Sequence, residues 1–276
     1  MSLPLYRFAW PSHRSAVLIS FDVDGEAGML SLDPRNSDLI STISSGTYGP
    51  TVGVPRILQL LERLGIKATF FVPGYTADLH PHVIEQIVQS GHELAHHGYL
   101  HKRMDELTQN EAIEELEKGM DSLKRFTGTN PLGYRAPWWH LRTGSIALLN
   151  RYGFLYDSSL MANDIPYLLP ESLGSIVELP VSFLLDDWEQ FGYVTSPQAG
   201  YCIEDTDKVF RLWSEEFDAL SVEGGCFVLT LHPWLIGRPS RVRLLERIIK
   251  HIQGDPNTWI ATGAELATAA KAVLNA

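Results

Sequence analysis

The chain has 276 residues, 45% of them hydrophobic and 20% charged, which is enough to bury one large core. Acidic residues outnumber basic ones by 33 to 22, and the net charge of -11 argues against nucleic acid or a membrane as a partner. The two cysteines, Cys202 and Cys226, lack the spacing of a thiolate zinc site or a disulfide framework. We expect one domain, spanning residues 1–276.

No segment of the sequence predicts export or membrane insertion. The N-terminal segment MSLPLYRFAWPSHRS lacks the basic start and apolar centre of a secretory signal. No run approaches the roughly 18 apolar residues that a spanning helix needs. We therefore expect a cytoplasmic protein.

Short β-rich runs alternate with amphipathic helical patterns along the chain. In chain order, we expect strand 16–22, helix 54–65, strand 68–72, helix 80–91, strand 92–97, helix 108–126, helix 143–153, strand 154–159, strand 176–183, helix 205–222, strand 226–232, helix 240–252, strand 258–262 and a helix from Gly263. This order favours a parallel sheet, doubly wound or closed into a barrel. Residues 27–52 are rich in Ser, Gly and Pro, and are expected to form an extended loop over the site or a contact between subunits.

Residue types that carry chemistry fall at the ends of the expected strands. Asp22, His97, Arg135, Asp157 and His232 each lie at the carboxyl end of a strand pattern. Barrel enzymes build their active sites on that face of the sheet, so we predict an α/β fold with a distorted TIM-like (β/α) barrel.

The segment FDVDGE at residues 21–26 places two aspartates, Asp22 and Asp24, one residue apart. They are candidates for the nucleophile and acid of a haloacid-dehalogenase-like phosphatase, for a metal site, or for the solvated polar end of a strand. The phosphatase interpretation is weakened by Glu26, which stands where such enzymes usually carry Thr, and by the lack of a later acidic pair preceded by Gly.

His97 and His101 are four residues apart, just after an expected strand. On a helical turn this spacing places two imidazoles on one face, where an aspartate from another strand end would complete a three-ligand catalytic metal site. Histidines at this spacing also occur on solvated faces. We interpret His92 and His96 as non-ligands, because His96 alternates with His97 along the strand and His92 lies near the strand's start.

Arg135 and His232 are further candidates for chemistry. Arg135 lies in GYRAPWW, and an arginine at a strand end can orient a catalytic carboxylate, although a surface ion pair is the simpler interpretation. His232 ends the apolar run FVLTLH, where it is either a buried core histidine or a general acid.

The motifs FDVDGE, HGYLH, RAPWW, YDSS and LTLH, in this order, resemble the polysaccharide deacetylase family, the carbohydrate-esterase group with the NodB homology domain. The resemblance covers residues 15–262. It implies a distorted (β/α) barrel and the metal-dependent hydrolysis of an N-acetyl or related amide bond.

The resemblance also implies roles for individual residues around a metal ion. Asp22 matches the general base, and Arg135 matches the arginine that holds this base. Asp24, His97 and His101 match the ligands of a divalent ion, for which we expect zinc, with cobalt or another transition metal as alternatives.

His232 matches the family's general acid. Asp157 is the expected acidic residue that tunes this histidine, although the usual tryptophan-containing sequence is absent around it. Asp164 and Asp187 are the alternatives for this position.

Val23 separates the two aspartates that are adjacent in most extracellular members of the family. This spacing, residues 27–52 and the sequence FVPG resemble the subgroup of Helicobacter-type peptidoglycan deacetylases, cyclic-imide hydrolases and allantoinases, which implies a homotetramer. The substrate is then an acetylated glycan or a small cyclic imide or ureide. A metal-free binding protein without catalysis is the alternative from another class.

Overall fold

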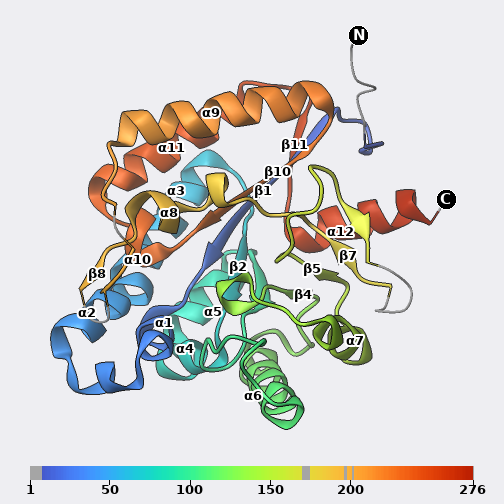
Figure 1. Cartoon of the computed structure of the whole chain (residues 1–276). Helices are drawn as coiled ribbons and strands as arrows, with labels where there is room; N and C mark the ends of the chain where they lie inside the picture. The colour runs from blue at the N-terminus through green and yellow to red at the C-terminus, as the bar shows by residue number, and fades with distance from the viewer. Residues whose placement is uncertain (1–7, 170–174, 196–197, 201, 276) are drawn as a thin grey trace.

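The computed structural model describes residues 8–169, 175–195, 198–200 and 202–275 (Figure 1). Its centre is a sheet with the strand order β10-β1-β2-β3-β4-β5-β7-β6. The strands are β1 (Ser15–Asp22), β2 (Thr69–Val72), β3 (Glu93–His96), β4 (Gly133–Tyr134), β5 (Tyr156–Asp157), β6 (Tyr167–Leu168), β7 (Val177–Glu178) and β10 (Cys226–Leu231). All neighbours in this order are parallel except β6 and β7.

β1 and β10 are the two longest strands of this sheet. Every residue of both strands is buried, which explains why their sequences are continuous apolar runs instead of alternating patterns. β11 (Thr258–Ile260) pairs with the first residues of β1, and β2 pairs with the last ones.

The sheet curls into a partial barrel. An isolated parallel bridge between Asp186 and Thr230 connects the chain that follows β7 to β10, at the other end of the strand order. The expected α/β fold with a distorted barrel is confirmed, and its distortion is greatest where this bridge replaces a full strand pair.

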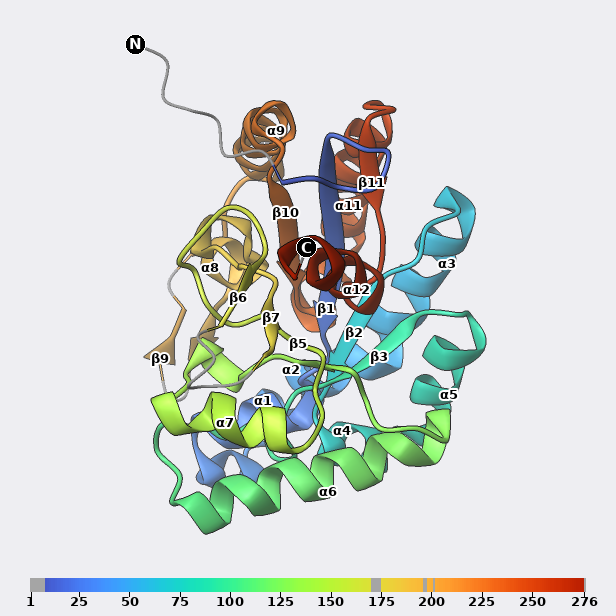
Figure 2. The same cartoon turned by 90° about the vertical axis from the view of Figure 1, so that its right-hand side faces the viewer.

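Helices surround the sheet, with α9 and α11 side by side at the top and α6 at the bottom of Figure 2. The longer ones are α3 (Val54–Leu64), α5 (Pro81–Gln89), α6 (Gln109–Thr127), α7 (Thr143–Arg151), α9 (Thr206–Glu223), α11 (Pro239–Gln253) and α12 (Gly263–Leu274). The shorter ones are α4 (Gly74–Leu79), α8 (Asp187–Phe191) and α10 (Pro233–Ile236). α6 begins at the predicted capping box of Thr108 and Glu111. In the described ranges, the structure has no helix with the length and apolarity needed to cross a bilayer.

Residues 27–52 do not form the extended loop that we expected. They belong to α1 (Gly25–Leu32), the 3-10 helix η1 (Pro34–Asp38), α2 (Ile40–Tyr48) and the π-helical turn η2 (Gly49–Gly53). A Cβ atom on Gly46 would lie 2.5 Å from the carbonyl oxygen of Gly25, so glycine here permits close contact between α1 and α2. The prediction was wrong because we interpreted these glycines as loop residues.

The strands expected at 154–159 and 176–183 are much shorter in the structure. β4, β5 and β7 have two residues each, and a two-residue hairpin, β8 (Val194–Thr195) with β9 (Gln198–Ala199), lies outside the main sheet. After β5 the chain leaves the ladder because its polar groups bind side chains instead. The carbonyl of Ser158 accepts from Arg135, and the N–H groups of Ser159 and Leu160 donate to Glu178.

Candidate active site

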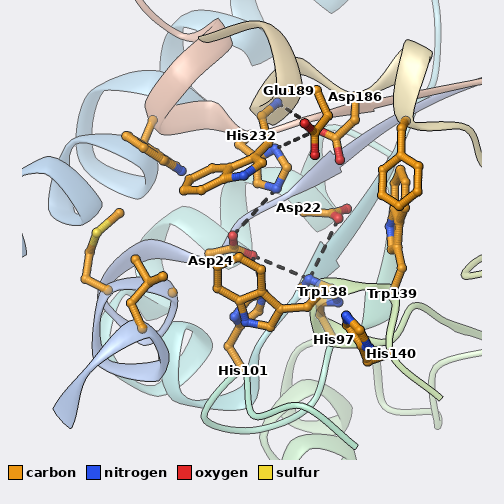
Figure 3. A pocket seen from close by; sticks show the side chains of 16 residues that line it. Asp22, Asp24, His97, His101, Trp138, Trp139, His140, Asp186, Glu189 and His232 are labelled. Atoms are coloured by element: carbon orange, nitrogen blue, oxygen red, sulfur yellow. Dashed lines mark hydrogen bonds and ion pairs between the residues drawn. The ribbon is translucent and has the colours of Figure 1, made fainter. Parts of the chain in front are cut away.

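A pocket of about 260 Å³ opens at the carboxyl ends of β1, β3 and β10 (Figure 3). Carboxylates and imidazoles line it together with aromatic rings. The polar residues are Asp22, Asp24, His97, His101, His140, Asp186, Glu189 and His232, and the aromatic ones are Trp138, Trp139, Phe183, Trp188 and Trp234. The structure thus brings residues from both ends of the sequence to one face of the barrel.

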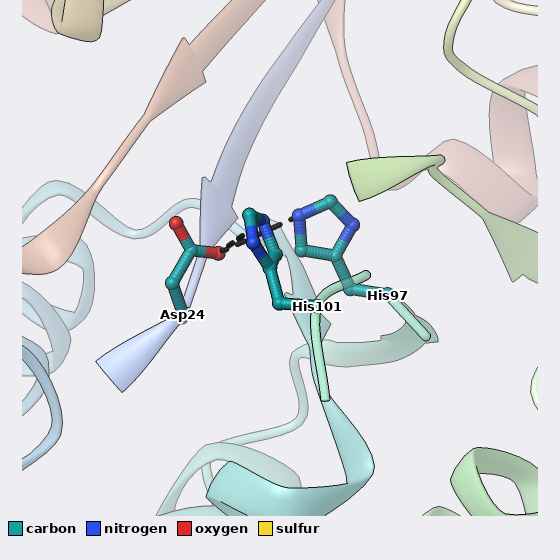
Figure 4. A group of neighbouring side chains, drawn as sticks. All are labelled: Asp24, His97 and His101. Atoms are coloured by element: carbon teal, nitrogen blue, oxygen red, sulfur yellow. Dashed lines mark ion pairs between the residues drawn. The ribbon is translucent and has the colours of Figure 1, made fainter. Parts of the chain in front are cut away.

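Asp24, His97 and His101 converge on one point in this pocket (Figure 4). The Oδ1 atom of Asp24 lies 3.5 Å from Nε2 of His97 and 3.4 Å from Nε2 of His101. Donor atoms that lie about 2.1 Å from a tetrahedral ion are roughly 3.4 Å from one another, so these spacings fit a zinc-like ion. The same Oδ1 atom is buried and has no hydrogen-bond partner, as expected of a ligand atom.

Both imidazoles have the tautomer that metal binding needs. Nδ1 of His97 lies 2.7 Å from the carbonyl oxygen of Arg135, which only accepts, so Nδ1 carries the proton. Nδ1 of His101 lies 3.0 Å from Oγ of Ser31, whose own proton is donated to the carbonyl of Gly28. Burial lowers the pKa of His101 to about 4, which keeps the ring neutral near pH 7. The two Nε2 lone pairs are therefore free to bind an ion.

Ser31 in α1 had no signal in the sequence, yet it holds His101. We expect Ser31→Ala to weaken metal binding about 10- to 100-fold, because His101 loses the contact that fixes its ring and tautomer. Titration against a competing chelator would measure this. Ser44→Ala is the matched control, since the Ser44 hydroxyl also donates to a carbonyl three residues earlier but lies on the exposed α2. Equal affinities in both variants would contradict the role of Ser31.

Arg135 is fully buried and holds Asp22. Its Nη1 atom donates to Oδ1 of Asp22 at 2.7 Å and to Oγ of Ser20 at 2.9 Å. Its Nε and Nη2 atoms donate to the carbonyl and the Oγ of Ser158, both at 3.0 Å, and the guanidinium lies 4.1 Å from the centre of the Phe71 ring. These contacts fix the direction of the Asp22 carboxylate.

The two serines were missed in the sequence, although Ser20 is a polar residue inside an apolar run. Each donates its only hydroxyl proton to a main-chain carbonyl, Ser20 to Leu229 and Ser158 to Leu179. Both oxygens must therefore accept from Arg135.

His232 lines the same pocket as Asp22 and is bound by Asp187. Nδ1 of His232 lies 2.7 Å from Oδ1 of Asp187, which also accepts the main-chain N–H of His232 at 2.9 Å. Burial alone would lower the pKa of His232, but the charges of Asp186, Asp187 and Asp24 raise it well above 6.5. The ring is therefore protonated near neutral pH, and its Nε2 atom lies 3.7 Å from Oδ2 of Asp24.

The expected pairing of Asp157 with His232 is wrong. Asp157 accepts a hydrogen bond from Ser159 and lies beside Glu178, because β5 pairs with β4 and β7 and is remote from β10 in the strand order. Asp187, one of the two alternatives, is the residue that binds His232. The bridge between the neighbouring Asp186 and Thr230 brings Asp187 to the end of β10. Asp164, the other alternative, is exposed.

His92 and His96 lie outside the cluster of ligand atoms, as predicted. Nε2 of His96 lies 3.1 Å from the carbonyl of Leu116, and burial lowers its pKa to about 3. His92 accepts the main-chain N–H of Ala68. Both are structural histidines of the sheet.

Backbone strain is concentrated at the pocket. Among the described residues, the non-glycine positions with positive φ are Ser12, His101, Trp138 and Trp139, with φ between 56° and 60°. Three of these four line the pocket. Such conformations cost about 1–3 kcal/mol each, so the surrounding contacts hold the two tryptophan rings in place at this cost.

Known proteins resemble this chain over nearly its full length. The family model described as polysaccharide deacetylase matches residues 42–156. A solved structure from Mycobacterium smegmatis, provisionally named a polysaccharide deacetylase, shares 42% identity with a TM-score of 0.93, covering 98% of this chain and 95% of that one. A peptidoglycan deacetylase of Helicobacter pylori is 29% identical over 91% of this chain and 95% of its own length.

A third relative shows the fold alone. The structure named Puue Allantoinase has a TM-score of 0.83 at 24% identity and covers 95% of this chain and 92% of that one. The 42% identity to the Mycobacterium smegmatis structure extends over almost all of the chain and shows its family. The protein belongs to the polysaccharide deacetylase family, whose members are hydrolases that act on amide carbon–nitrogen bonds.

Proposed function

We propose that this protein is a metal-dependent deacetylase that removes the acetyl group from the nitrogen of an amino sugar or glycan. One observation carries the proposal: a three-ligand cluster lies between a carboxylate held by arginine and a histidine held by aspartate. These groups are Asp24, His97 and His101 for the cluster, Asp22 with Arg135, and His232 with Asp187.

The residues of the pocket divide the reaction between them. A divalent ion bound by Asp24, His97 and His101 would polarise the amide carbonyl and supply Lewis-acid stabilisation of developing negative charge. Asp22, oriented by Arg135, accepts the proton of the attacking water. His232 donates its proton to the leaving nitrogen, which must depart as a neutral amine. The pocket thus provides both a base and an acid.

We propose zinc as the ion, because two imidazoles and one carboxylate with the spacing described above suit it. Metal analysis after purification without chelator, followed by reconstitution of the stripped protein with zinc, cobalt or magnesium, tests this. Less than about one ion per two chains, with no rescue by any of them, would support a binding protein without catalysis.

The function is tested by comparing acetate release from N-acetylglucosamine oligomers with ring opening of succinimide. The deacetylase proposal expects turnover of the oligomers. A hydrolase of cyclic imides or ureides is the second candidate, because a pocket of about 260 Å³ with aromatic walls suits a single ring. Turnover of succinimide alone would replace the first proposal by the second.

The pocket favours substrates without negative charge. Among the described residues that line it, none is Lys or Arg, whereas Glu189 adds a carboxylate beyond Asp22 and Asp24. We expect neutral or cationic acetylated amines to exceed an anionic analogue of equal size in kcat/KM by about tenfold or more. The difference should shrink as ionic strength rises, because Glu189 is exposed. Equal kcat/KM values at low salt would contradict this.

Asp187→Asn is expected to move the alkaline limb of the pH profile of kcat/KM to lower pH. The carboxylate of Asp187 raises the pKa of His232, and His232 acts as the general acid only while it is protonated. Without the charge of Asp187, His232 loses its proton at a lower pH, so activity should be lost at a lower pH on the alkaline side. The pH profile of acetate release measures the shift. Asp164→Asn, at an exposed position, is the control and should leave the profile unchanged.

We further propose that residues 1–276 form one catalytic domain and that four copies assemble. Three partly or largely exposed apolar residues, Leu39, Ile40 and Val52, lie in the helical segment near the pocket and suit a contact between copies. Light scattering of the purified protein tests the tetramer. The cytoplasmic location stays a prediction, which fractionation of cells tests.

A further inference from the structure

A row of four polar side chains, three of them fully buried, crosses the sheet. Tyr134 in β4 is in register with Asp157 in β5, Asp157 with Glu178 in β7, and Glu178 with Tyr167 in β6. In-register neighbours on adjacent strands point to the same face, so these four side chains adjoin one another. Among the described residues, eight buried polar atoms lack a hydrogen-bond partner, and four of them belong to this row. They are Tyr134 Oη, Asp157 Oδ2, Tyr167 Oη and Glu178 Oε2.

In each of the carboxyl groups of Asp157 and Glu178, one oxygen accepts hydrogen bonds and the other has no donor. Oε1 of Glu178 accepts the N–H groups of Ser159 and Leu160, both at 2.9 Å, and Oδ1 of Asp157 accepts the hydroxyl of Ser159 at 2.8 Å. The other two oxygens have no donor within the described protein. Two neighbouring buried carboxylates would repel each other. Arg135 does not pair directly with either of them, because its ion-pair partner is the Asp22 carboxylate. A single proton shared between Oδ2 of Asp157 and Oε2 of Glu178 removes one negative charge and so the repulsion. It also gives each of these two oxygens a hydrogen-bond partner.

We propose that Asp157 and Glu178 share one proton and that this pair positions Arg135, and through it Asp22, for catalysis. Burial raises the pKa of Asp157 to about 6, and burial followed by the charge of Asp157 raises the pKa of Glu178 well above 4.5. Glu178 is therefore the member that carries the proton near neutral pH.

The pair acts through the segment that follows β5. Glu178 and Asp157 fix Ser159 and Leu160, and Ser159 in turn accepts the N–H of Ala136. Ser158, which lies between Asp157 and Ser159 in the chain, accepts from Nε and Nη2 of Arg135. Ser158 thus holds the side chain of Arg135, and Ser159 holds the main chain of the next residue, Ala136. The inference rests on the proposed role of Asp22 as the base.

Two substitutions at Glu178 test whether catalysis needs the hydrogen bonds of the carboxyl pair, or only a side chain that fills this part of the core. Glu178→Gln keeps an oxygen for Ser159 and Leu160 and places an N–H donor where the proton lies, so kcat and KM should stay close to those of the unchanged protein. Glu178→Leu leaves two N–H groups without an acceptor and releases the segment. Its kcat should fall about 10²-fold, with KM little changed, because misplacing the groups around Asp22 by about 1 Å has that cost.

Infrared spectroscopy in heavy water tests the proton directly. The unchanged protein should show the C=O band of a buried carboxylic acid near neutral pH, and Glu178→Gln should lack it. Asp186 and Glu93, whose pKa values are also raised, contribute equally to both spectra and cancel in the difference. Identical spectra, or a kcat of Glu178→Gln as low as that of Glu178→Leu, would overturn the proposal.

The proton also predicts how stability depends on pH. A carboxyl group with a raised pKa in the folded state binds a proton that the unfolded chain has lost, so its contribution to the free energy of unfolding falls as pH rises. Arg135, Tyr134 and Tyr167 also face the pair; burial raises the pKa of both tyrosines, so they keep their protons over this range. Between about pH 5 and 8, the unchanged protein should lose stability more steeply than Glu178→Gln. Parallel curves would contradict the shared proton.

The infrared band and the unfolding curves do not require turnover. If the acid band disappears in Glu178→Gln while no acetylated substrate is hydrolysed, the proton pair stands and the proposed function fails. If the substrates are hydrolysed and the spectra are identical, the proposed function stands and the proton pair fails.

Discussion

His97→Ala is expected to lose both the metal ion and turnover. Nε2 of His97 lies 3.5 Å from Oδ1 of Asp24, and its removal leaves only two protein ligands for a divalent ion. A bound metal contributes several kcal/mol to such a reaction, so kcat/KM should fall at least about 10³-fold. Metal content by mass spectrometry and acetate release from an active substrate measure the two effects.

The matched control for this change is His82→Ala. His82 is largely exposed in α5 and does not belong to the ligand cluster, so its loss should leave metal content and turnover unchanged. Circular dichroism should show both variants folded, because alanine at position 97 keeps the main-chain hydrogen bond to Val72. A His97→Ala protein with a full complement of metal would show that the cluster is not the binding site.

Asp22→Asn is expected to retain the metal and lower kcat by about 10²- to 10⁴-fold. The asparagine oxygen can still accept from Nη1 of Arg135, so the local structure is kept, while the amide cannot take a proton from water. Metal content and single-turnover acetate release separate binding from chemistry.

The complementary variant is Asp24→Asn, which should lose the metal because the buried Oδ1 atom is the point where both imidazoles converge. Asp22 is also close to the cluster, with Oδ2 at 3.7 Å from Nε2 of His97. If Asp22→Asn empties the site and Asp24→Asn retains the ion, the roles of the two aspartates are exchanged.

The convergence of the site was predictable from strand ends. Asp22, His97 and His232 follow β-rich runs, and parallel strands present their carboxyl ends on one face, so residues far apart in sequence meet there. The order of strands in the sheet was not predictable in this way. Asp157 also follows a strand, but β5 lies several strands away from β10, and His232 is bound by Asp187 instead.

The supporting residues could not be predicted because they have no characteristic spacing. Ser20, Ser31 and Ser158 act through a single hydroxyl whose direction depends on which carbonyl is nearby in the fold. Residues 27–52 were misjudged for a related reason. Whether a glycine serves a loop or a close helix contact, as Gly46 does against Gly25, depends on what packs against it.

The carboxylate of Asp187 both closes the curled sheet and sets the acidity of His232. Within the ranges that the structure describes, the end of the strand order at β10 is joined to the chain after β7 by the bridge at Asp186 and by the two hydrogen bonds of Asp187. Heating that opens this seam would remove the proton donor while Asp24, His97 and His101, which follow the ends of β1 and β3, still hold their ion. Thermal inactivation would then precede release of the metal, and an inactive protein with a full metal content would be the first product of heating.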